Sequence, residues 1–186
     1  MTGTSSGLID STVIAAVITG FVALLVLAGN QYQGRKDRLR KDFAEALAAV
    51  ERYAELPYRI LRRQDSTPEV RGRITELIHE VQQDILFHES WVRIQSSDVA
   101  DTYDALLRVM RVEAGTAMTQ AWNMAPITKD EDMPLGSGFT FPLMAEQRRK
   151  YVKAVGWHLQ PAILRWAREH LIPWLIERSG RKPSDP

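Results

Sequence analysis

Residues Ser11 to Gly29 contain no charged side chain, and this run of nineteen residues constrains the chain more than any other feature. As an α-helix rising about 1.5 Å per residue, it would span nearly 30 Å, roughly the hydrocarbon core of a bilayer. Its apolar stretches, Val13 to Ile18 and Phe21 to Leu27, are too uniform for an amphipathic helix. The run predicts a transmembrane helix over residues 11–29, preceded by a short extracytoplasmic N-terminus over residues 1–10.

A cleaved signal peptide is the alternative interpretation of this run. Such a peptide has a basic segment before its apolar core and a small-residue cleavage site after it. Residues 1–10 contain no Lys or Arg, and basic residues follow closely after Ala28-Gly29-Asn30. The sequence therefore favours an uncleaved, single-pass anchor.

A basic juxtamembrane segment, residues 30–42, follows the uncharged run and predicts its orientation. Its five basic residues are Arg35, Lys36, Arg38, Arg40 and Lys41, whereas no basic residue precedes the run. By the positive-inside rule, the N-terminus lies outside and the following domain is cytoplasmic. We expect the five basic side chains to contact lipid head groups, which makes the lipid bilayer a predicted partner.

Composition is consistent with this location. The chain contains no cysteine, as suits a reducing compartment, and arginine outnumbers lysine 18 to 6, a ratio typical of GC-rich bacterial genomes. The predicted location is therefore the plasma (inner) membrane of a bacterium.

Residues 43–178 are expected to form an all-α bundle of about four helices, because apolar residues recur every three or four positions and no strand pattern occurs. The first helix is predicted over residues 36–63, kinked or broken at Pro57. The second begins at a Ser66 or Thr67 cap, and the third begins at Ser96 and ends near Trp122. A long loop over residues 124–143 leads to a fourth helix over about 143–178, interrupted by two prolines, and residues 179–186 are expected to be a disordered tail.

Apolar stripes identify the expected core. On the second helix the stripe contains Val70, Ile74, Leu77, Ile78, Val81, Ile85, His88 and Val92, and on the third it contains Val99, Tyr103, Leu106, Leu107, Met110, Ala114, Ala117 and Ala121. On the fourth helix the stripe assigned to the core contains Tyr151, Val152, Val155, Leu159, Ala162, Ile163 and Trp166.

A second apolar stripe on the fourth helix, Trp157, Leu164, Leu171 and Leu175, is a candidate interface. Its first three members are spaced by seven residues, which suits packing between helices. Three arrangements are open: burial inside the bundle, pairing with another subunit or partner, and contact with the membrane surface. In the anchor, Ala16, Gly20 and Ala23 form a small-residue surface that is a candidate for transmembrane helix packing.

Candidate chemistry is sparse in this sequence. Glu76 and His79 match the Glu-x-x-His element of diiron bundles, but the second element is missing and His79 is predicted to face solvent. His88 is expected to be a core histidine with a local hydrogen bond. No nucleotide-binding, nucleophile or zinc motif is found, so we predict no catalytic residue, no metal site and no cofactor.

Charge is unevenly distributed along the chain. Residues 43–143 hold 10 basic and 16 acidic side chains, whereas residues 144–186 hold 9 and 4. Either the basic fourth helix packs against acidic helices, or Arg148, Arg149, Lys150 and Lys153 contact anionic lipid. The overall net charge of +1 argues against nucleic-acid binding.

The sequence therefore predicts a membrane-anchored cytoplasmic helical module that acts in protein–protein interaction or regulation, with a protein partner or as a homo-oligomer. The alternative is a membrane-anchored enzyme or a cation or small-ligand sensor that uses acidic residues of the second helix and the 124–143 loop.

Overall fold

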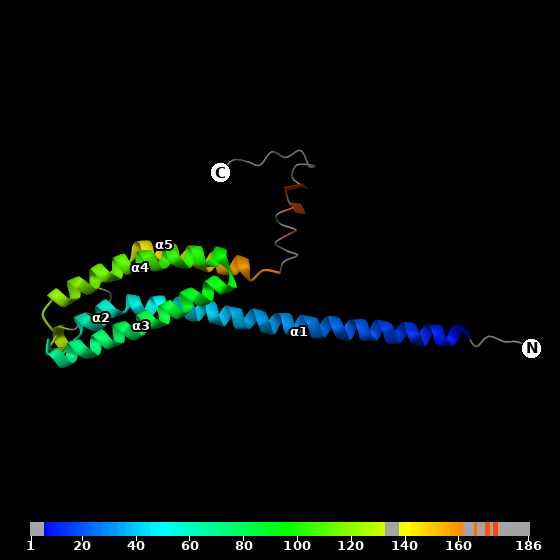
Figure 1. The fold of residues 1–186 in the computed structure, drawn as a ribbon, viewed down its shortest axis with the longest axis horizontal. Helices are drawn as coiled ribbons and strands as arrows, with labels where there is room; N and C mark the ends of the chain where they lie inside the picture. Colours follow the sequence, from blue (N-terminus) through cyan, green and yellow to red (C-terminus); the bar gives the residue numbers. More distant parts are fainter. Residues whose placement is uncertain (1–5, 133–137, 162–165, 167–169, 172, 175–186) are drawn as a thin grey trace, which may run out of the picture. The chain divides into compact units, whose positions relative to one another are not determined.

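The computed structural model describes residues 6–132, 138–161, 166, 170, 171, 173 and 174, and these residues contain helices and turns but no strand. The predicted all-α class is therefore confirmed. The helices, labelled in Figure 1, are α1 (Ser6–Ala54), α2 (Leu56–Leu61), α3 (Pro68–Gln95), α4 (Ser97–Asn123) and α5 (Pro142–His158), with a short 3₁₀ helix, η1, at Asp130–Asp132. The chain divides into two compact units with a boundary between Lys41 and Asp42.

The first unit consists of the N-terminal part of α1, which continues through Gly34 without a hinge. In the part of the chain that the structure describes, no helix combines the length and the apolar content that crossing a membrane requires. The transmembrane helix over residues 11–29 stays a prediction.

The second unit begins with the last part of α1, which ends earlier than predicted. The expected kink at Pro57 is a complete break, because α1 stops at Ala54 and α2 begins at Leu56 with Pro57 in its first turn. Proline suits this position, since the first turn of a helix has no intrahelical partner for its N–H groups.

Helix α3 runs antiparallel to the last part of α1. Near the start of this part of α1, the rings of Phe43 and Trp91 pack in a T-shaped arrangement with their centroids 5.1 Å apart. Farther along α1, Arg52 forms an ion pair with Asp84 of α3. The predicted start of α3 is confirmed: the Thr67 hydroxyl oxygen accepts a hydrogen bond of 3.4 Å from the Val70 N–H.

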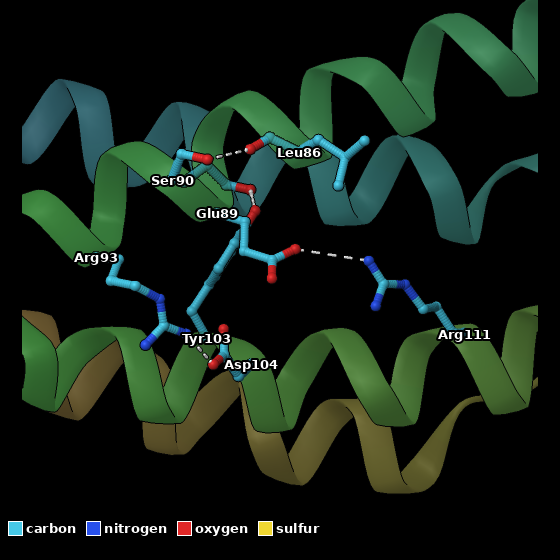
Figure 2. Close-up of polar contacts among 8 residues, drawn as sticks. Leu86, Glu89, Ser90, Arg93, Tyr103, Asp104 and Arg111 are labelled. Atoms are coloured by element: carbon cyan, nitrogen blue, oxygen red, sulfur yellow. Dashed lines mark hydrogen bonds and ion pairs between the residues drawn. The ribbon is translucent and has the colours of Figure 1, made fainter.

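Helix α4 returns antiparallel to α3 after a turn of one residue, Ser96. The Ser96 hydroxyl oxygen accepts a hydrogen bond from the Val99 N–H and caps α4, at the predicted start of this helix. Figure 2 shows two ion pairs that join the helices: Glu89 lies 3.6 Å from Arg111, and Arg93 pairs with Asp104.

Helix α5 packs along α4 in the helical bundle (Figure 1). The side chain of Glu113 on α4 accepts hydrogen bonds from the backbone N–H groups of Leu143 and Met144, at 3.1 and 2.9 Å. These N–H groups belong to the first turn of α5, where a carboxylate also complements the helix dipole.

The predicted stripes form most of the core. Every stripe residue of α4 is buried, and on α3 the stripe residues are buried or half-buried. On α5 the assignment of Val152 to the core was wrong, because this side chain is 53 % exposed. The buried positions of α5 are Met144 and Tyr151, and Val152 is turned by about 100° from its buried neighbour.

Two buried tyrosines hold α4 and α5 to α1. The Tyr103 hydroxyl donates a hydrogen bond of 3.0 Å to the Ala46 carbonyl oxygen, and the Tyr151 hydroxyl donates one of 2.9 Å to the Phe43 carbonyl oxygen. Their rings lie 5.3 Å apart. Burial raises the pKa of both phenols far above the ordinary value of 10.0, so each hydroxyl keeps its proton.

A buried arginine, Arg63, caps the C-terminal end of α4 with its guanidinium group. Its Nη1 donates to the carbonyl oxygens of Ile60 and Ala121 at 3.0 and 2.9 Å, and its Nη2 donates to those of Trp122 and Met124. The Ile60 and Ala121 carbonyl oxygens also accept hydrogen bonds from backbone N–H groups, those of Arg63 and Met124 respectively, so the guanidinium is a second, charged donor at this helix end.

Candidate functional site

The predicted membrane-contact residues all lie in α1. Lys36 is half-buried, whereas Arg35, Arg38, Arg40 and Lys41 are exposed. The Arg40 guanidinium lies 3.9 Å from the Asp37 carboxylate on the next turn. Ala16, Gly20 and Ala23 also belong to α1, where Gly20 and Ala23 are exposed. Both sets stay predictions.

The candidate interface on the fourth helix is described only in part. Trp157 is half-buried and lines a surface groove of about 590 Å³ together with Lys150 and Lys153. Leu171 is 39 % exposed, whereas Leu164 and Leu175 lie outside the described residues. This stripe stays a prediction.

The residues considered for metal chemistry lie apart. Glu76, His79 and Glu80 are exposed on α3, and His79 contacts Gln83 one turn later. His88 is buried, as expected, and its Nε2 lies 3.5 Å from the Asp84 carboxylate, which Arg52 also contacts. Among the described residues, no three His, Cys, Asp or Glu side chains gather in a way that could hold a metal ion.

A direct contact joins the basic fourth helix to an acidic part of the bundle. Arg148 on α5 lies 3.2 Å from Glu51 on α1, which supports packing of the basic helix against an acidic one. Arg149, Lys150 and Lys153 are exposed, and their contact with anionic lipid stays a prediction.

Sequence analysis missed an exposed apolar surface on α3, which we call the α3 outer face. It contains His79, Gln83, Leu86, Phe87, Ser90 and Ile94, all exposed and none a Lys, Arg, Asp or Glu. Leu86 is 57 % exposed, Phe87 64 % and Ile94 81 %. These residues project from the side of α3 opposite its core stripe, at the 100° spacing of a helix.

A cavity between α2 and α3, which we call the α2–α3 pocket, was also missed. It has a volume of about 580 Å³, within the range of small-molecule sites. The residues that line it are Glu55, Tyr58, Arg59, Arg62, Arg63, Gln64, Val70, Arg73, Ile74 and Leu77. Four arginines thus surround one carboxylate, and the arginine-rich sequence from Arg59 to Arg73 was the available signal.

Comparison of the chain with protein-family models, curated proteins and solved structures finds no match.

Proposed function

We propose that this protein is a single-pass membrane module, with its N-terminus outside, whose cytoplasmic helical domain associates with a second copy through the α3 outer face. Support for the anchor comes from the uncharged run Ser11–Gly29 and from the five basic residues that follow it, with none before. In this proposal the anchor fixes the domain at the inner surface of the plasma membrane, and the domain supplies the interaction.

The observation that carries the interaction is the exposure of Leu86, Phe87 and Ile94 on one uncharged face. Full burial of a large apolar side chain contributes roughly 1.5–3 kcal/mol relative to exposure, so a partner that covers these three gains a substantial driving force.

The spacing on this face favours a helix as the partner. Gln83, Phe87, Ser90 and Ile94 follow one another at steps of four, three and four residues, the spacing of the a and d positions of a heptad repeat. Ser90 at the centre is small, so a facing helix could approach closely.

A second copy of the chain is the binding partner of the α3 outer face that fits these observations. Two copies of one helical face form an isologous pair related by a two-fold axis, in which each stripe meets itself. A shared membrane would hold both copies in the same orientation and raise their effective concentration, so a seam as short as residues 83–94 could suffice. The small surface of Ala16, Gly20 and Ala23 would allow the anchors of the same pair to pack.

The absence of native cysteine makes a direct test possible. The Ser90→Cys variant of the full chain is placed in membranes and oxidised, and disulfide-linked dimer is measured on a non-reducing gel. We expect a dimer with this variant and none with Thr119→Cys, the matched control on an exposed position of α4. Adding Phe87→Ser and Ile94→Ser to Ser90→Cys should abolish the dimer.

Equal crosslinking of Ser90→Cys and Thr119→Cys would indicate random collision and would contradict the proposal. A crosslink from Ser90→Cys to a different protein would replace the second copy with another partner. Absence of any crosslink at Ser90, with the domain folded, would also contradict it.

A further inference from the structure

We infer that the α2–α3 pocket binds an organic phosphate: a phosphate monoester attached to an apolar group. This inference is independent of the proposed self-association, because the pocket and the α3 outer face share no residue. It also differs from the cation site considered from sequence, because the charge that lines the pocket is positive.

The guanidinium groups around the pocket have different roles. Arg63 is buried and is committed to the carbonyl oxygens at the end of α4. The Arg62 guanidinium lies over the Tyr58 ring, 5.5 Å from its centroid. Arg59 and Arg73 are exposed, and Arg73 interacts electrostatically with the Asp65 carboxylate.

The nearby carboxylates offset only part of this positive charge. Among the described residues, Glu55 is the one acidic residue that lines the pocket. Asp65, in the turn between α2 and α3, accepts hydrogen bonds from both the N–H and the hydroxyl of Thr67, which lowers the pKa of its carboxyl. One of its oxygens, Oδ1, is therefore directed to the cap of α3.

The pocket also has an apolar wall. Val70 is buried, and Ile74 and Leu77 are half-buried along the same side of α3. Guanidinium groups bind phosphate oxygens through paired hydrogen bonds, whereas Val, Ile and Leu side chains favour an uncharged hydrocarbon or ring. A ligand that satisfies both surfaces has a phosphate at one end and an apolar body at the other.

The test uses 1-naphthyl phosphate as the probe, with the full chain in detergent micelles and isothermal titration calorimetry as the measurement. We expect saturable binding that weakens as salt is raised, because exposed arginines dominate the attraction. Inorganic phosphate and 1-naphthol should each bind at least about tenfold more weakly, since each lacks one half of the recognised chemistry.

Variants assign the binding to the pocket. Arg59→Gln with Arg73→Gln should weaken binding about tenfold or more, whereas Arg108→Gln, on an exposed position of α4, should leave it unchanged. Glu55→Gln should tighten binding by about threefold, because it removes the only carboxylate of the pocket. A gain in affinity cannot arise from misfolding, so this variant tests the site even if the double variant is unstable.

A further experiment in lipid vesicles shows whether the natural ligand is a lipid or a soluble organic phosphate. If the natural ligand is a lipid, the protein in phosphatidylcholine vesicles that contain phosphatidic acid should no longer bind the probe, whereas vesicles without it should leave binding intact. If both preparations bind equally, the ligand is a soluble organic phosphate. Probe binding that is unaffected by Arg59→Gln with Arg73→Gln, or no binding at millimolar probe, would overturn the inference.

Discussion

The Nη1 of Arg63 donates a hydrogen bond of 2.9 Å to the carbonyl oxygen of Ala121, which lies 58 residues later in the chain. This contact joins the segment after α2 to the end of α4, and the guanidinium also lies 5.3 Å from the Trp122 ring. The Arg63 side chain therefore caps α4 and holds the turn after α2, which borders the α2–α3 pocket, against the end of α4.

Replacing Arg63 should destabilise the domain strongly. Arg63→Ala removes the charged donor from the carbonyl oxygens of Ile60, Ala121, Trp122 and Met124, and we expect the free energy of unfolding to fall by about 3 kcal/mol. Arg59→Ala, an exposed control, should change it by less than about 0.5 kcal/mol. Denaturant unfolding of both variants, followed by circular dichroism, checks this prediction, and similar losses in the two would contradict it.

The tyrosine hydroxyls should each contribute a smaller amount. Tyr103→Phe and Tyr151→Phe remove the donors to the Ala46 and Phe43 carbonyl oxygens, so each should lower the free energy of unfolding by about 1 kcal/mol. The same unfolding experiment measures the loss, and Tyr32→Phe, at an exposed tyrosine of α1, is the matched control. No loss in either core variant would show that these two hydrogen bonds contribute nothing net.

Alkaline pH should weaken the same contacts. Burial raises the pKa of Tyr103 and Tyr151 above the ordinary value of 10.0, so the folded state binds these protons more tightly than the unfolded state. Their contribution is therefore fully present below pH 10 and is lost as the pH rises above it. The free energy of unfolding, measured between pH 8 and pH 11.5, should decline less steeply above pH 10 in the Tyr103→Phe, Tyr151→Phe double variant. Identical slopes would refute this assignment.

Sequence periodicity predicted the bundle well where one side of a helix is buried. The stripes on α3 and α4, the cap at Thr67 and the start of α4 after Ser96 were confirmed, because a 3.6-residue repeat and a capping hydroxyl are local signals. Val152 was misassigned, since a stripe drawn over a helix with apolar residues on several sides does not show which residue turns inward.

Both newly found surfaces depend on information that periodicity does not contain. Arg63 is buried although arginines are rarely buried, and only the folded chain places the end of α4 beside it. The basic pocket was not predicted, because its arginines lie within residues 43–143, where acidic residues outnumber basic ones. The α3 outer face was overlooked because its polar members, Gln83 and Ser90, interrupt the apolar pattern.

The central claim, an anchored protein with a cytoplasmic domain, is tested most directly by thiol labelling of single-cysteine variants in intact bacterial cells. The native chain has no cysteine, so Thr4→Cys reports the N-terminus and Thr119→Cys reports α4. The account predicts that the protein stays in the membrane pellet after alkaline carbonate extraction. It also predicts that a membrane-impermeant maleimide labels only Thr4→Cys until the cells are broken, after which Thr119→Cys is labelled too. Recovery of the protein in the carbonate supernatant, or labelling of Thr119→Cys in intact cells, would contradict it.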